Sequence, residues 1–330
     1  MPQKSQKQSA RAKTSSTASP KRAAGKRRTR QLEKPDYKSF RLSKRIKHPD
    51  GPLLPGRKIM ARGLRLINQR RGLFVLMLLL YVALTLSFVR GFGAKTQLPY
   101  LKTLYDSIND GSAMRTGFDL LGVLLGRGNA AYSEAGAVYQ TLLLLIFSMA
   151  TIWVLRQTAA GRYVTLRDSL YKGMYPFVTM SLVLLVVTLQ LIPGYFGTVL
   201  YLTVLSGGLA VTVLEQVLWF CLVVLLVLWS LYMATSSLFA LYIVTLPDVT
   251  PMQALRSARD LVRWRRWMVM RRVMFLPFAV GIFSVVVLFP TIAWLTPAAE
   301  WVFLILGLGS LFVFHAYMYV LYRELIGENA

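Results

Sequence analysis

The stretch RKIMARGLRLINQRR (residues 57–71) runs directly into GLFVLMLLLYVALTLSFVR (residues 72–90), and this junction decides the fold class. In the first part Met60, Leu64 and Ile67 recur at helical spacing, with arginines on the other sides. This pattern predicts an amphipathic helix in the headgroup region of a membrane. The second part is a long apolar run, and about 20 such residues cross a bilayer as a helix. Its length also favours an uncleaved signal-anchor over a cleaved signal peptide.

Further apolar runs follow, and the composition agrees with them. Hydrophobic residues make up 55% of the chain and charged residues only 16%, whereas soluble domains carry about 25% charged residues. Together with the first run, the apolar runs lie near residues 72–90, 137–155, 174–193, 216–246, 273–292 and 300–322. We therefore expect an all-α, polytopic membrane bundle of about six spans within residues 72–330, preceded by a basic tail (1–56) and the amphipathic helix (57–71).

The distribution of positive charge predicts the orientation of this bundle. Of the 39 Lys and Arg residues, 22 lie within residues 1–71. Between the spans, the 156–173 and 247–272 loops are basic, while the 194–215 and 293–299 segments have no Lys or Arg and the 91–136 loop balances its four with four acids. Positive loops are retained in the cytoplasm. The alternation predicts a multi-pass protein of the cell membrane with both termini in the cytoplasm and 91–136 as an outer loop.

The segment from 194 to 215 threatens this count, because it is apolar enough to form a seventh span. A seventh span would place the two basic loops on opposite sides of the membrane. Four glycines, at positions 194, 197, 207 and 208, also interrupt the run. We expect a re-entrant or outer-interface segment, and a crossing helix stays the alternative.

Two loops expected in the cytoplasm resemble each other. VTLRDSLYKG (164–173) and VTPMQALRSA (249–258) both start with Val-Thr and carry an acid or amide three residues after the threonine. This is the capping-box pattern, so each should open a short helix that turns the chain back to the membrane. The match suggests two duplicated halves, 137–193 and 216–292, but it covers only about ten residues.

A family resemblance becomes visible in residues 247–272, PDVTPMQALRSARDLVRWRRWMVMRR. The shared features are an Ala-Leu helix start, apolar positions and an Arg-x-x-Arg-Trp motif. They correspond to Ala254, Leu255, Ala258, Leu261, Val262, Arg263, Arg266 and Trp267. In this, residues 137–322 resemble bacterial integral membrane proteins similar to the membrane domain of glycerophosphoryl diester phosphodiesterases. The resemblance implies a six-helix bundle. It implies no phosphodiesterase activity, because the soluble catalytic barrel of that family has no counterpart in this chain.

The same loop supplies the main candidate site. Helical spacing places Arg256, Arg259, Arg263 and Arg266 along one face, with Trp264 and Trp267 beside it. Arginine side chains bind lipid phosphate, and tryptophan settles at headgroup level. We expect a contact with anionic lipid phosphate through these arginines and Trp267. The alternative is a topological loop with aromatic anchors and no ligand.

The basic tail, residues 1–56, is low in complexity through residue 35, and we expect it to be disordered. It can contact anionic lipid, or nonspecifically RNA or the ribosome, through charge alone. Without stacking aromatics before Tyr37, specific RNA recognition is not expected. The alternative is a solvated tail that only enforces orientation.

Few ionisable groups lie near the expected spans: Glu215, Glu300 and His315. Ionisable groups at membrane depth are functional candidates by default. Glu215 and Glu300 are expected at the hydrated outer interface, and a hydrogen-bonded packing role is favoured for His315. A lone cysteine, Cys221, and two histidines argue against a metal centre, so we expect no cofactor.

Three functions follow, in order of preference. The first is a non-enzymatic scaffold or accessory protein that contacts anionic lipid through its basic surfaces, which can also bind protein partners. The second is a transporter with a site near the glycine-broken segment 194–215, since transporters use interrupted helices. The third is a membrane-embedded enzyme, which the scarcity of catalytic groups disfavours.

Overall fold

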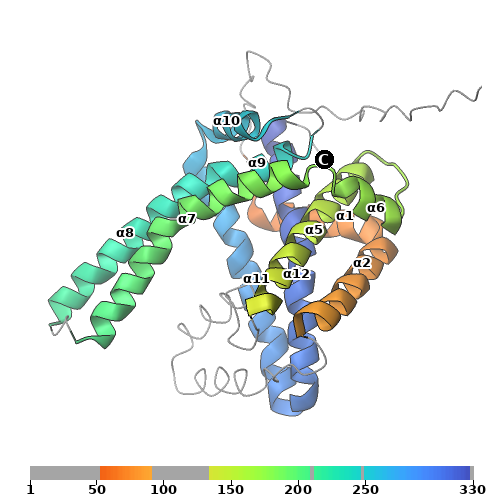
Figure 1. The fold of residues 1–330 in the computed structure, drawn as a ribbon. Helices are drawn as coiled ribbons and strands as arrows, with labels where there is room; N and C mark the ends of the chain where they lie inside the picture. Colours follow the sequence, from red (N-terminus) through yellow and green to blue (C-terminus); the bar gives the residue numbers. More distant parts are fainter. Residues whose placement is uncertain (1–52, 91–133, 209–211, 247–248, 328–330) are drawn as a thin grey trace, which may run out of the picture. The chain divides into compact units, whose positions relative to one another are not determined.

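The computed structural model describes residues 53–90, 134–208, 212–246 and 249–327, which fold into helices joined by short connections (Figure 1). The elements are α1 (Gly56–Gln69), α2 (Arg71–Leu84), the π-helix η1 (Thr85–Arg90), α5 (Glu134–Ala159), α6 (Leu166–Gly173), α7 (Phe177–Ser206), α8 (Val213–Leu238), α9 (Ala240–Ile243), α10 (Pro251–Val262), α11 (Arg266–Trp294) and α12 (Thr296–Ile326). Most of the basic tail and of the expected outer loop lies outside the described residues.

Six helical stretches are long and apolar enough to cross a membrane, which confirms the all-α, multi-pass prediction. They are Arg71–Val89, Gly136–Ala159, Phe177–Leu205, Val213–Ile243, Arg266–Trp294 and Pro297–Ile326. Successive spans run in opposite directions. The start of α2, the end of α5, the start of α7, the end of α9, the start of α11 and the end of α12 therefore share one side. We call it the basic side, because α6 and α10 with their arginines also lie there.

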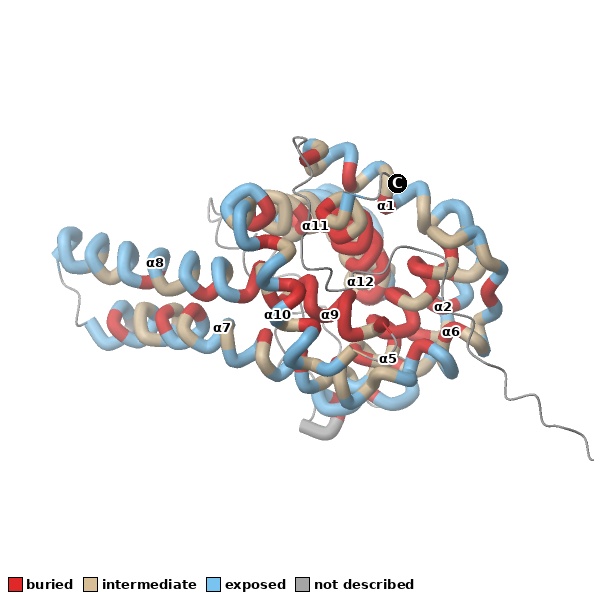
Figure 2. The backbone as a smooth tube through the Cα atoms, turned by 90° about the horizontal axis from the view of Figure 1, so that it is seen from above, coloured by how far each residue is buried: buried red, intermediate tan, exposed pale blue. Residues whose placement is uncertain are grey.

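The segment 194–215 adds no seventh span, but its expected re-entrant form is wrong. Residues 194–206 continue α7 as one helix that contains Pro193, and residues 213–215 begin α8. The turn between the helices includes Gly208 with a φ of 64°. Gly194 and Gly197 lie within the continuous helix α7, where they allow close packing. A Cβ at Gly194 would lie 3.1 Å from Ser230 Cβ in α8. Figures 1 and 2 show α7 and α8 side by side.

The two short helices α6 and α10 form as expected. The Thr165 side chain accepts from the backbone N–H of Asp168, and Thr250 and Gln253 form a complete capping box. The aligned positions are also buried alike: Ser169 and Gly173 in α6 correspond to Ala254 and Ala258 in α10. Small residues one turn apart let both helices pack closely; a Cβ at Gly173 would lie 3.0 Å from Ala150 Cα in α5.

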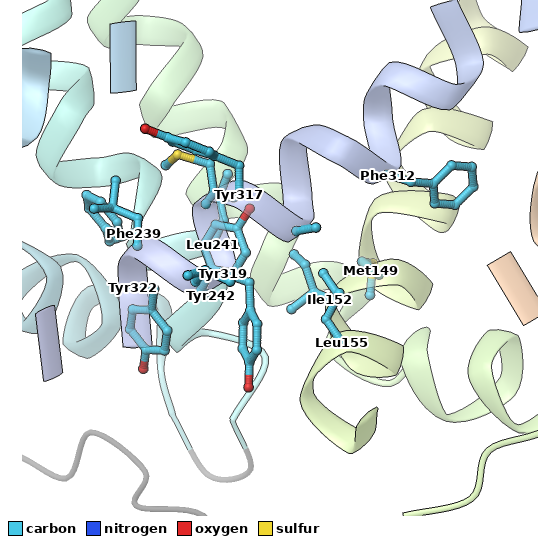
Figure 3. Close-up of a cluster of buried hydrophobic side chains, with 14 of the residues drawn as sticks. Met149, Ile152, Leu155, Phe239, Leu241, Tyr242, Phe312, Tyr317, Tyr319 and Tyr322 are labelled. Atoms are coloured by element: carbon cyan, nitrogen blue, oxygen red, sulfur yellow. The ribbon is translucent and has the colours of Figure 1, made fainter. Parts of the chain in front are cut away.

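The hydrophobic core lies between α5, α9 and α12, where buried segments gather in Figure 2. Over an apolar stretch of 18 residues in each span, more than half of the residues are buried in α5 and in α12, compared with about a fifth in α7 and α8. Figure 3 shows the packed side chains, with Ile152 and Leu155 from α5, Phe239 and Tyr242 at the α8–α9 junction, and Tyr317 from α12.

Helix α1 packs on this core through its glycine. A Cβ at Gly63 would lie 3.2 Å from the backbone of Ala316 and Tyr317, so α1 crosses α12 at close range. Ile59, one turn earlier, is fully buried. The arginines Arg57 and Arg65 stay exposed. The apolar side of the amphipathic helix α1 thus packs against the bundle.

Candidate functional site

Helix α10 presents a basic outer face. Its apolar side buries Ala254, Ala258 and Val262, which fixes the helix against the bundle, where it contacts α8 and α9. Arg256 and Arg259 then point outward and are exposed. Because α10 lies between the end of α9 and the start of α11, this face lies at the ends of two spans.

The predicted row of four arginines is shorter than expected. Helix α10 ends at Val262, and α11 begins at Arg266 after a turn at residues 263–265. Arg263 is exposed at this turn, and its guanidinium carbon lies 5.4 Å from the ring centroid of Trp264. Arg266 belongs to α11 instead and lies 5.2 Å from the ring of Tyr232 in α8. Arg266 therefore takes part in packing rather than in the α10 row.

Two tryptophans flank the turn. Trp264 is 72% exposed and Trp267 is 67% exposed. Large aromatic side chains at the end of a span, beside exposed arginines, are typical of the headgroup region of a membrane. We call Arg256, Arg259, Arg263, Trp264 and Trp267 the α10 surface.

The chain segment before α1 is held by a polar contact that sequence reasoning missed. The Leu53 carbonyl accepts from Arg272 Nη2 at 2.6 Å, and the Leu54 N–H donates to Glu324 Oε1. The hydroxyl of Tyr317 in α12 donates to the carbonyl of Arg272 at 2.8 Å. This latch joins α11 and α12 to the start of α1. The contact uses backbone groups of Leu53 and Leu54, so the residue types at these positions do not predict it.

The other unexpected group is Arg156, which is only 3% exposed near the end of α5. Its Nη1 donates to the Thr245 carbonyl at 2.7 Å. Its Nη2 donates to the Tyr242 carbonyl at 2.7 Å and to Thr245 Oγ1 at 2.6 Å. These carbonyls lie at the end of α9, where helical partners are missing and the dipole is negative. In the sequence, Arg156 is only one of the four basic residues of the 156–173 loop, and nothing in the pattern distinguishes it.

His315 lies at the other side of Tyr242. It is buried, and its Nδ1 is 2.9 Å from the Tyr242 hydroxyl, with which it shares a hydrogen bond. The hydrogen-bonded packing position favoured from the sequence is therefore observed. Through Tyr242, a polar chain runs from Arg156 in α5 across α9 to His315 in α12.

The two glutamates lie apart from this chain. Glu215 is exposed in the first turn of α8, where its carboxylate accepts from the backbone N–H of Thr212 at 3.1 Å and completes a capping box. That geometry makes it a helix cap. Glu300 lies half-buried in the first part of α12. The structure does not bring Glu215 or Glu300 together with His315 in any contact it describes.

Within the described ranges, no group of three or more His, Cys, Asp or Glu side chains gathers closely enough to hold a metal ion. The polar chain is built from side chains that bond to backbone and to one another. The described surface of the basic side carries the exposed arginines Arg256, Arg259 and Arg263.

Comparison with known proteins adds no family: no protein-family model, curated protein or solved structure matches this chain.

Proposed function

We propose that this integral membrane protein is a non-enzymatic scaffold or accessory protein that contacts anionic lipid headgroups through its basic side, which faces the cytoplasm. The observation that carries the proposal is the α10 surface. Its arginines and tryptophans are exposed at the ends of two spans while the opposite side of α10 is packed against the bundle.

The physical basis is electrostatic attraction between the arginines of the basic side and anionic headgroups. The ends of the spans fix the depth of these arginines in the membrane. Each Lys or Arg near an anionic leaflet contributes on the order of 1 kcal/mol. Residues 53–90 add Arg57, Lys58 and Arg65 in α1, all exposed, and that segment contains no acidic residue. The positive-inside rule supports the cytoplasmic orientation.

The transporter alternative loses part of its motivation. It relied on the glycine-broken segment 194–215 and on the possible duplicated halves, and α7 is continuous through Gly194 and Gly197. The polar groups between Arg156 and His315 are hydrogen-bonded to one another and to backbone. They therefore do not suggest a substrate site. The resemblance to phosphodiesterase membrane domains stays a proposal and supplies no activity.

The test uses the full chain reconstituted in neutral phosphatidylcholine vesicles with trace spin-labelled lipids. We expect the immobilised fraction to be several-fold larger for phosphatidylglycerol than for phosphatidylcholine at low salt, and the preference to shrink as salt screens the charges.

The matched variants are the triple changes Arg256→Gln, Arg259→Gln and Arg263→Gln, against Lys at the same positions. The Gln triple should lose much of the preference and the Lys triple should keep it. Equal retention of both lipids by the unmodified chain would overturn the proposal.

A further inference from the structure

A second basic site lies at the corner between α1 and α2, away from the α10 surface. Helix α1 ends at Gln69, α2 starts at Arg71, and Arg70 between them leaves helical geometry with φ −128° and ψ 38°. This break turns Arg70 toward the chain that follows α5. Its guanidinium carbon lies 5.0 Å from the ring centroid of Tyr163, and its Nη2 donates to the Arg162 carbonyl at 3.4 Å. We call Arg70, Arg71, Arg162 and Tyr163 the α2 corner.

The depth of the α2 corner follows from the ends of the spans. Arg71 is the first residue of the first span, and Ala159 is the last residue of the second, three residues before Arg162. Helix α2 contacts both α5 and α6, and Figure 1 shows their ends together on the basic side. Residues at the end of a span lie among lipid headgroups. Tyr163, 81% exposed, is the kind of aromatic side chain that settles there.

Two arginines of the α2 corner, Arg70 and Arg71, keep their positive charge. Neither Arg70 nor Arg71 forms an ion pair with any acidic side chain of the described residues. Asp168 is the one acid of the 156–173 loop, and it is engaged by Lys172 at 3.1 Å and by the Thr165 hydroxyl at 2.7 Å. The stacked ring of Tyr163 holds the Arg70 guanidinium without neutralising it. Arg71, the next residue, is exposed. Guanidinium groups match the oxygens of a phosphate.

We propose that the α2 corner binds the phosphate of one anionic phospholipid, with Arg70 and Arg71 as donors and Tyr163 as the side chain that positions Arg70. The proposal rests on the proposed lipid-binding function and deepens it from a diffuse surface to a discrete site. A membrane lipid is favoured over free phosphate because the corner lies at the ends of the α2 and α5 spans.

The experiment is native mass spectrometry of the full chain, purified in a neutral detergent and titrated with phosphatidylglycerol or phosphatidylcholine. The unmodified chain should retain phosphatidylglycerol preferentially. The double change Arg70→Gln and Arg71→Gln should lower its apparent affinity about tenfold, since a hydrogen bond to a charged group contributes enough for such a factor. Tyr163→Leu should lower it several-fold, whereas Tyr163→Phe keeps the ring and most of the affinity.

The control removes the same charge elsewhere, through Arg57→Gln with Arg65→Gln on the exposed side of α1. A loss as large as that of the corner variant would overturn the discrete site in favour of diffuse attraction. Full affinity in both the Arg70/Arg71 and Tyr163→Leu variants, with a loss in the α10 triple, would overturn the α2 corner and leave the proposed function standing. No preference for phosphatidylglycerol in the unmodified chain would overturn the proposed function itself.

Two further measurements distinguish loss of binding from misfolding, and a membrane lipid from a soluble phosphate. The double change Arg70→Lys and Arg71→Lys should keep the charge and most of the affinity, and circular dichroism checks that every variant stays helical. Soluble glycerol phosphate should not displace the lipid at equal concentration; displacement would overturn the assignment to a membrane lipid.

Discussion

Two helix pairs of this bundle are built in different ways. Over an apolar stretch of 18 residues in each span, α5 and α12 bury more than half of the residues, while α7 and α8 bury about a fifth. The buried pair also holds the charged and polar side chains Arg156 and His315, both tied to α9. The exposed pair holds apolar side chains on all sides and meets through Gly194 and Gly197.

The difference shows which forces hold each pair. Lipid tails are as apolar as leucine, so exposed apolar surface gives α7 and α8 no reason to associate in a membrane. Their pairing depends on close approach at small residues. In α5 and α12, the polar chain adds contacts with defined partners, and it should fix which helices come together.

The largest effect is expected at Arg156. Arg156→Met keeps the side-chain length but removes the donors to the Thr245 carbonyl, the Thr245 hydroxyl and the Tyr242 carbonyl, which still accepts from Thr245 Oγ1. Each hydrogen bond to a charged group contributes about 1.5–3 kcal/mol, so we expect the unfolding free energy to fall by about 3 kcal/mol or more. Titration with sodium dodecyl sulfate in mixed micelles, followed by tryptophan fluorescence, measures it.

Arg156→Lys is the control, because lysine keeps the charge but not the planar fork that reaches both carbonyls. It should recover part of the lost stability. If Arg156→Met were as stable as the unmodified chain, the polar chain would be incidental to the packing of α5 with α9.

The second effect concerns the close crossing of α1 and α12. Gly63→Val would push side-chain atoms into the backbone of Ala316 and Tyr317, which cannot rotate away. Overpacking of this kind costs about 1–3 kcal/mol. The matched Gly197→Val has the same helix propensity, but its nearest neighbour is the methyl end of Leu226, at 2.8 Å from the ideal Cβ. We expect it to cost less than half as much in the same titration, because a methyl group can rotate away where backbone cannot; equal losses would contradict this difference between the two crossings.

The extent to which sequence predicted this structure follows the same division. The spans, the loop helices and their caps were predictable, because apolar length and Thr-x-x-Asp/Gln spacing are local properties. The latch at Leu53 and the role of Arg156 were not, because they join residues far apart in the chain through backbone atoms. Gly194 and Gly197 misled the prediction, since a glycine that breaks a helix and one that packs it look alike in a sequence.

The α10 surface shows the same limit within one candidate site. Its arginine spacing predicted a single face, and the exposed part, Arg256 and Arg259, agrees. The end of α10 at Val262 removed Arg266 from the row, and no proline or glycine at residues 263–265 signals that turn.

The third effect tests the His315 end of the polar chain. Tyr242→Phe removes the hydroxyl that shares a hydrogen bond with His315 Nδ1, while the ring keeps its packing. Side-chain hydrogen bonds between membrane helices contribute about 0.6 kcal/mol on average, and the buried histidine nitrogen left behind raises the expected loss to about 1 kcal/mol. The double variant with His315→Leu should lose less than the sum of the single changes; strict additivity would show that the two groups do not interact.

The smallest effect is expected in the exposed pair, at Ser230 of α8. Its hydroxyl donates to the Gln190 carbonyl of α7 at 2.5 Å, a direct hydrogen bond between α7 and α8. That carbonyl belongs to the middle of α7, and an i+4 helical N–H also bonds there in a regular helix. Ser230→Ala should therefore reduce stability by only about 0.5 kcal/mol. Ser230→Leu should cost more, because Gly194 leaves no room beyond the serine Cβ. If Ser230→Ala cost as much as Arg156→Met, hydrogen bonding rather than close approach would hold α7 to α8.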